Sequence, residues 1–201
     1  LTDAQKAQMF KYFGVSETEV YVIEVTNADE RKYLEGVASD EDIGKRTFSC
    51  SYIAPTESGT GIKVKMANIE KITSNMIASA LTTAGVYNCE VLAASPIAVS
   101  GTGALTGIMM AFEKVTGEEL PEEKKELATK ELVATEEVSS EVEKAILEDL
   151  EKDGALTEEK KEEARKDAQD TAAGIMTEVK AQVIANNITN ETEINNIVNE
   201  V

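Results

Sequence analysis

The aromatic residues divide this chain into two regions of different composition. All nine Phe and Tyr residues and both cysteines lie within residues 1–112. That region has 9 basic and 13 acidic side chains, whereas the rest of the chain has 11 basic and 25 acidic ones. Large apolar side chains fill the space between a sheet and its helices, so the first region can form a layered core. The second region lacks aromatic residues and is strongly charged, which favours solvated helices.

The first region alternates between helical and extended patterns, which predicts a mixed α/β (α+β) domain over residues 1–115. We expect a mixed four-stranded sheet with packed helices. The strands are predicted at 20–26, 47–54, 61–67 and 86–94, and the helices at 3–13, 28–36, 69–84 and 102–115. The turn-rich residues between the second and third strands favour a hairpin.

The strand order stays open at this stage. Without the first helix, the order of elements is βαββαβ, as in a ferredoxin-like sandwich whose second and fourth strands lie on opposite edges. Cys50 and Cys89 fall in those two strands. An even cysteine count predicts a disulfide between them, with two buried free thiols as the alternative. A disulfide would require the two strands to be neighbours and would exclude the ferredoxin order.

The second region, residues 116–201, is predicted to be acidic and all-helical. Helices are expected at 121–133, at 139–153, from 157 to about 183 and from about 190 to the end. The third carries a narrow stripe of small apolar residues, namely Ala164, Ala168, Ala172, Ile175, Val179 and Val183. Such thin stripes indicate a helical arm or a region packed on the first domain.

The charge and the absence of histidine exclude several classes of function. A net charge of −18 repels phosphate backbones, so we expect no nucleic-acid partner. With no His, a Ser-His-Asp triad, an HExxH zinc site and His-ligated haem are excluded. No stretch reaches the 18 apolar residues of a membrane-spanning helix. The composition therefore favours a non-enzymatic protein, and no cofactor is predicted.

A glycine-rich loop between the last strand and its following helix is the first candidate ligand site. Glycines let a backbone approach a ligand closely, and a helix N-terminus offers free N–H groups to an anion. The candidate residues are Ser100, Gly101, Thr102, Gly103 and Thr106. The loop has neither the Lys of a P-loop nor the spacing of a dinucleotide fingerprint, so an ordinary tight turn is the alternative.

Two further sets of candidates are polar or acidic. Asn27 and Arg31 after the first strand, and Ser74 and Asn75 early in a helix, could converge on a cleft or could serve as caps and surface ion pairs. Part of a calcium loop is suggested by Asp149, Glu151, Asp153 and Glu159. Lys160 stands where an EF-hand needs its bidentate Glu, so an acidic turn is the alternative to weak calcium binding.

Five segments together resemble the uncharacterised family known as domain-of-unknown-function family 1002. They are TDAQKAQMFKYFGV, EVTNADERKYLEG, GKRTFSCSYIAP, TSNMIASALTTAGV and SGTGALTGIMMAFEKVTG. The resemblance covers residues 1–118 and continues more loosely through KKELATKELVATEEV. It implies export from a Gram-positive bacterium behind a signal peptide, which fits a chain that begins at Leu1. It implies no activity and no catalytic residues, and an extracytoplasmic location favours the disulfide.

These observations lead to two functional hypotheses. The first is an exported, non-enzymatic binding or cell-envelope-associated protein, whose partner is an envelope component or another protein docked near Ser100–Thr106. The alternative is a hydrolase of envelope polymers that uses carboxylates such as Glu24, Glu30 or Glu90. It requires two carboxyl groups about 5–9.5 Å apart across a groove.

Overall fold

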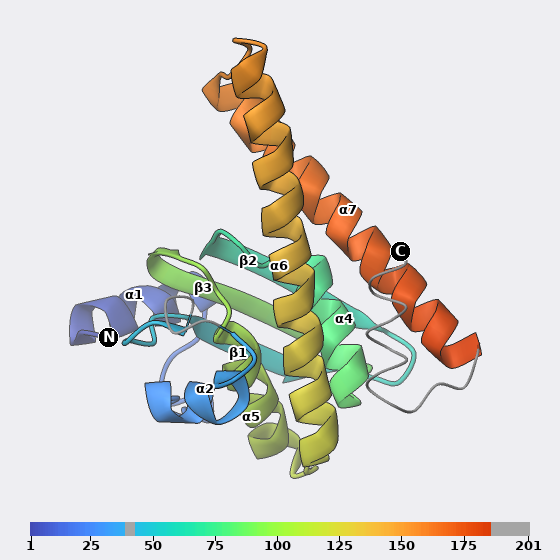
Figure 1. Ribbon diagram of the computed structural model, residues 1–201. Coiled ribbons are helices and arrows are strands. Elements are labelled where there is room, and N and C mark those ends of the chain that lie inside the picture. The colour runs from blue at the N-terminus through green and yellow to red at the C-terminus, as the bar shows by residue number, and fades with distance from the viewer. Residues whose placement is uncertain (39–42, 186–201) are drawn as a thin grey trace. The chain divides into compact units, whose positions relative to one another are not determined.

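The computed structural model describes residues 1–38 and 43–185 (Figure 1). Contacts divide the chain into two compact units, Leu1–Val133 and Ala134–Val201. The composition changes near residue 112, whereas the contacts divide later, because the first turns of a long helix bury Ala128 and Leu132 in the core of the first unit. The predicted final helix, from about residue 190, lies outside the described residues.

A three-stranded sheet forms the centre of the first unit, with the strand order β1-β3-β2. The strands are β1 (Cys50–Pro55), β2 (Ile62–Ile69) and β3 (Cys89–Val99). β3 pairs antiparallel with β1 and parallel with β2. The predicted four-stranded sheet is therefore wrong, because the sheet has three strands. The predicted hairpin between 47–54 and 61–67 and the ferredoxin order are also wrong, because β3 lies between β1 and β2.

The missing strand is Val20–Thr26, which is not part of a strand in the structure. Its β-branched residues predicted a strand, but strand propensity is expressed only where a neighbouring strand supplies partners. Val25 instead lies beside Gly107 of helix α5 (Ala104–Thr116). A Cβ added to Gly107 would lie 3.7 Å from the Val25 side chain, which is an ordinary van der Waals distance. Val25 thus packs near α5, whereas Tyr21 and Val22 are exposed, and the segment adds no strand to the sheet.

Helices cover the two faces of this sheet. Helix α4 (Ser74–Ala84) connects β2 to β3 and packs on β2, and α5 packs on β1. Together they cover the face that carries Ile53, Val64 and Val91. Helix α1 (Asp3–Phe13) lies beside β3 (Figure 1). It borders a cleft with Ala67 and Ala94 on the other face of the sheet.

The helix boundaries follow local capping chemistry. Thr2 and Gln5 form a capping box at the start of α1, and Gly14 ends the helix in the left-handed conformation. Helix α2 (Asn27–Leu34) is capped by Thr26 in a box with Asp29. The predicted cap, Asn27, is thus one residue off, and this frees its side chain for tertiary contacts.

One ion cluster joins α2, α5 and helix α6 (Glu122–Lys152). The Lys125 ammonium lies 3.1 Å from Glu113 Oε1 and 2.7 Å from Glu122 Oε1, and its side chain is only 8% exposed. The Tyr33 hydroxyl donates to Glu122 Oε2 at 3.0 Å. A nearly buried ammonium needs such partners to offset its desolvation.

The second unit contains the rest of α6 and helix α7 (Glu158–Ala185). α6 is a single 31-residue helix, so the two predicted helices 121–133 and 139–153 are one. Thr157 Oγ1 accepts from the Lys160 amide at the start of α7, as predicted for a cap. Ala164, Ala168, Ala172 and Val179 of the predicted stripe are buried. None of the helices in the described part of the chain is long and apolar enough to cross a membrane.

Candidate functional site

The glycine-rich loop lies at the carboxyl ends of the parallel strands β2 and β3. Glu70 and Lys71 donate their amides to the carbonyls of Val99 and Ser100, at 2.9 and 3.2 Å. α4 and α5 therefore begin beside one another at this edge, which is where open α/β sheets commonly bind ligands. Ser74 and Asn75 occupy the first turn of α4, and the side chain of Thr73 caps that helix.

The loop itself is packed inside the protein. Gly101 has φ 94°, and a Cβ on it would collide with Ile69. Thr102 is 4% exposed and Thr106 is 1% exposed. The Thr102 hydroxyl is the only buried side-chain polar atom without a hydrogen-bond partner among the described residues. The glycines here are required by the backbone conformation and by close packing.

The carboxylate of Glu30 fills the space at the N-terminus of α5. α5 has no side-chain cap, and a Cβ on its N-cap residue Gly103 would overlap the Glu30 carboxyl group. Glu30 is 4% exposed. A negative group at a helix N-terminus compensates the positive end of the helix dipole. The position that an anionic ligand could occupy is thus taken by the protein's own side chain.

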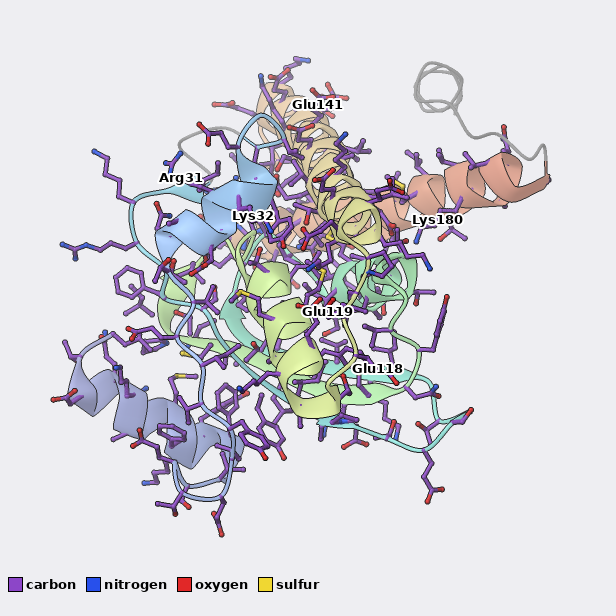
Figure 2. The ribbon with its side chains drawn as sticks, turned by 90° about the horizontal axis from the view of Figure 1, so that it is seen from below. Arg31, Lys32, Glu118, Glu119, Glu141 and Lys180 are labelled. Carbon is purple, nitrogen blue, oxygen red and sulfur yellow. The ribbon has the colours of Figure 1, made fainter. Side chains whose placement is uncertain are left out.

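A polar network from α2 holds Glu30 in this position, and one of its members, Arg31, is labelled on this helix in Figure 2. Thr47 Oγ1 donates to Glu30 Oε2 at 2.7 Å, and Asn27 Nδ2 lies 3.5 Å from the same oxygen. Arg31 Nε donates to Asn27 Oδ1 at 3.1 Å, and another nitrogen of Arg31 donates to the Gly44 carbonyl at 3.2 Å. Burial raises the pKa of the Glu30 carboxyl, while the Thr47 and Asn27 bonds act in the opposite direction.

The structure therefore brings two of the predicted sets of residues together. Asn27 and Arg31 reach the loop at Gly103 through Glu30, but they face a filled space. Of the three carboxylates proposed for a hydrolase, Glu30 lies at the loop and Glu90 lies far from it. Glu90 lies at the opposite end of β3 from the loop, about 30 Å along the strand, and forms an ion pair with Lys63. Glu24 lies in the segment before α2 and is exposed.

The four calcium candidates are not assembled as a loop. Asp149 and Glu151 belong to α6, Asp153 follows its end, and Glu159 begins α7. Asp149 accepts from Lys152 at 3.0 Å. Among the described residues there is no group of three or more Cys, Asp or Glu side chains that could hold a metal ion.

The predicted disulfide is not formed, and both cysteines are free. Their strands are neighbours, as a bond would require, but Cys50 pairs with Ala94 and Cys89 pairs with Pro55. The two residues are five positions apart along the ladder, about 17 Å, whereas a disulfide needs Cα atoms less than about 7 Å apart. The odd offset also places them on opposite faces of the sheet. Burial raises the pKa of Cys89 to about 11.

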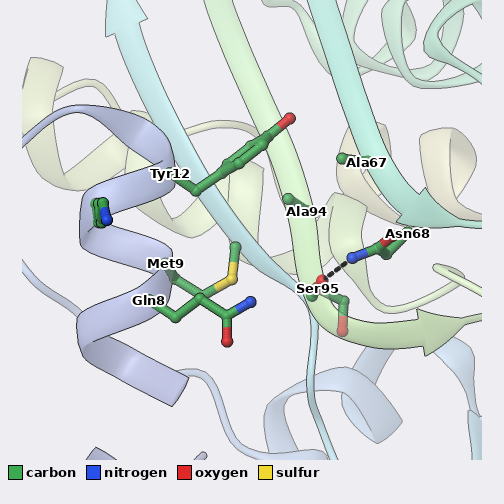
Figure 3. Close-up of a pocket in the computed structure, with 8 residues that line it drawn as sticks. Gln8, Met9, Tyr12, Ala67, Asn68, Ala94 and Ser95 are labelled. Carbon is green, nitrogen blue, oxygen red and sulfur yellow. Dashed lines mark hydrogen bonds between the residues drawn. The ribbon is translucent and has the colours of Figure 1, made fainter. Parts of the chain in front are cut away.

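An open cleft lies between α1 and the sheet, and we call it the α1 cleft (Figure 3). It has a volume of about 310 Å³, within the range of small-ligand sites. Its lining residues are Gln8, Met9, Lys11, Tyr12, Ala67, Asn68, Ala94 and Ser95. Figure 3 shows Gln8, Met9 and Tyr12 reaching from α1 toward Ala94 and Ser95 of β3.

A bulge in β2 shapes one side of the α1 cleft. The pairing with β3 shifts between Ala67 and Ile69, and Asn68 between them has φ 58°. Asn tolerates this left-handed conformation better than most residues. Its Nδ2 donates to the Ser95 carbonyl at 2.8 Å, which fixes the side chain at the cleft. Bulges often redirect side chains next to binding sites.

The sequence contained two signals for this cleft. Gln8, Lys11 and Tyr12 have the i, i+3, i+4 spacing of one helix face, beside the buried Met9. Asn68 follows the alternating strand KVKMA, where an Asn suggests a left-handed position. Neither signal indicates that α1 packs over β3, which depends on the tertiary fold.

The comparisons with known proteins point to a family without an assigned activity. The family described as "Protein of unknown function (DUF1002)" matches residues 1–201. The chain is 37% identical over 142 residues to the "Uncharacterized protein YpuA" of Bacillus subtilis (strain 168). This match covers 71% of the chain and 49% of YpuA, so the chain spans about half the length of that relative. No solved structure matches the chain.

Proposed function

This chain belongs to the DUF1002 family, and on that premise we propose that it is an exported, non-enzymatic protein that binds a component of the cell envelope. The export follows from the family resemblance of residues 1–118. The binding role is supported by one observation, the α1 cleft, which is open and has a mixed apolar and amide lining.

The lining of the cleft favours binding over acid–base catalysis. Its ionisable side chains are Lys11 and Tyr12, and no carboxylate is among its lining residues. General acid–base chemistry is carried most often by His, Glu or Asp side chains, and none of these is among the lining residues. Amide and aromatic side chains, in contrast, are common in sites that hold a neutral or weakly charged ligand.

The proposal is tested by sedimentation of the purified chain with isolated cell envelopes of the source organism. We expect the wild-type chain to pellet with the envelopes and the Gln8→Ala/Tyr12→Ala double variant to stay in the supernatant. Tyr87→Ala is the matched control, because Tyr87 is 58% exposed, close to the 53% of Tyr12, and lies outside the cleft. Absence of pelleting by the wild-type chain, or equal pelleting of all three proteins, would contradict the proposal. Cell fractionation with an antibody against the chain tests its export separately.

A further inference from the structure

We propose that the α1 cleft binds a sugar ring that carries a carboxylate, such as an N-acetylmuramic acid unit. This inference rests on the function proposed above and names the chemical class of ligand for the same cleft. Three properties of the cleft support it: an exposed aromatic ring above an apolar floor, side-chain amides at its edge, and a single unpaired cation.

The aromatic ring is that of Tyr12. It is 53% exposed and projects from α1 over β3 (Figure 3). Beneath it lie Ala67, Ala94 and the buried side chain of Met9. A pyranose ring has one face of C–H groups that can pack on an aromatic ring, while its hydroxyls point outward around the edge. A flat, partly apolar ring therefore suits this space better than a long aliphatic chain, which needs a deeper apolar pocket.

Two amide side chains are placed to bind hydroxyls or an N-acyl group. The Gln8 amide makes no hydrogen bond with any described residue, so both its donor and its acceptor are available. Asn68 uses Nδ2 for the Ser95 carbonyl, and this bond leaves Oδ1 as an oriented acceptor. Amides donate and accept at neighbouring atoms, which is the pattern that hydroxyls and N-acetyl groups require.

The charge of the cleft favours an anionic substituent on the ring. Lys11 is the one charged residue of the lining, and in the described part of the chain it forms no ion pair. Because the lining has no carboxylate, an acidic ligand meets no like charge inside the cleft.

The experiment is a calorimetric titration with two disaccharides that differ in one substituent. N-acetylglucosaminyl-N-acetylmuramic acid carries the carboxylate, and N,N′-diacetylchitobiose has the same rings and N-acetyl groups without it. We expect the acidic disaccharide to bind about two- to fivefold more tightly, the range of a solvent-exposed ion pair. Lys11→Gln is expected to bring the two affinities together. Tyr12→Ala is expected to weaken both by about tenfold.

Binding of neither disaccharide at millimolar concentration would overturn the inference, as would equal affinities for both or binding that Tyr12→Ala leaves intact. The Tyr87→Ala variant again serves as the control. Failure here is distinguishable from failure of the proposed function. If the chain pellets with envelopes through its cleft but binds neither sugar, only this inference is wrong, whereas a chain that does not pellet contradicts the proposed function itself.

Discussion

The loop before α5 and the α1 cleft lie on neighbouring parts of the same strand, yet one is filled and the other is open. The loop follows the end of β3, and its helix N-terminus is occupied by the Glu30 carboxylate from α2. The cleft borders Ser95 within β3, and no side chain of the described residues fills its 310 Å³. A glycine-rich sequence thus indicates a backbone conformation, while a distant side chain determines whether a ligand has room.

The largest expected effect comes from adding a methyl group to the filled loop. Gly101→Ala combines a left-handed backbone at φ 94° with a collision against Ile69, and Gly103→Ala collides with the buried Glu30. We expect Gly101→Ala to lower the free energy of unfolding by about 2–4 kcal/mol and Gly103→Ala by about 1–3 kcal/mol. Urea denaturation followed by circular dichroism measures both values.

Gly107→Ala is the control within the same helix. A Cβ at this position would lie 3.6 Å from Ser51 Oγ and 3.7 Å from Val25, which are ordinary contacts, and its φ is not positive. Replacement of a glycine inside a helix by alanine should stabilise the protein by about 0.5–1 kcal/mol. If Gly101→Ala and Gly103→Ala were as stable as Gly107→Ala, the loop would have space for a ligand, and the contrast with the cleft would be lost.

A second prediction concerns the pH dependence that Glu30 gives to stability. Burial raises the folded-state pKa of Glu30 above 4.5, and the neighbouring Asp29 adds to this effect. Between pH 4.5 and the raised pKa, the folded state therefore holds more protons on Glu30 than the unfolded state does. The contribution of Glu30 to the free energy of unfolding falls as the pH rises through this range.

Glu30→Gln keeps the shape of the side chain and its acceptor for Thr47 but does not titrate. The difference in free energy of unfolding, wild type minus Glu30→Gln, should become more negative as the pH rises from 4.5 to 7. Denaturation series at several pH values measure it. A difference that is constant with pH would show that the Glu30 carboxyl is as well solvated as it is in the unfolded chain.

Glu122→Gln provides a control of opposite sign. The hydrogen bond from Lys125 lowers the pKa of Glu122 to about 2. Its stabilising contribution is therefore present above pH 4.5 and is lost as the pH falls toward 2. Because Glu122 is 55% exposed, we expect this contribution to be no more than about 1 kcal/mol. The two variants should thus respond to acid in opposite directions.

A smaller effect on stability is expected in the open cleft. Tyr12 is half-exposed and touches Phe13 edge-on, with ring centroids 5.6 Å apart. Tyr12→Ala should therefore change the free energy of unfolding by less than about 1 kcal/mol, while it weakens envelope binding. If Tyr12→Ala destabilised the protein as much as Gly101→Ala, the tyrosine would be a packing residue and the cleft would not be an independent site.

Local chemistry explains which parts of the fold could be predicted. The ends of α1 and α4 follow from Gly14 and Gly85, which adopt left-handed conformations after each helix. The alternation of 62–67 likewise predicts β2. The fate of Val20–Thr26 and the position of β3 between β1 and β2 could not be predicted, because pairing depends on which segments meet in space. The sequence did not connect Asn27 and Arg31 with the loop, because their contact with it runs through the Glu30 side chain and depends on the tertiary fold.

The cysteines give the last prediction, in which no effect is expected. A disulfide was a reasonable prediction for an exported chain with two cysteines in strands, and only the strand register separates Cys50 from Cys89. The intact mass should be unchanged by reduction, and two alkyl groups should be added once the protein is unfolded. Reductant should likewise leave the denaturation midpoint unchanged, because no covalent loop is opened.

A mass lower by two protons that reduction restores would require a shift of β1 along β3 by several residues. A shift by an even number of residues keeps Ile53 in the core but leaves the two cysteines on opposite faces of the sheet. A shift by an odd number would bring them onto one face but would turn Ile53 away from the core. Burial of Ile53 therefore supports the observed register, in which the cysteines stay apart.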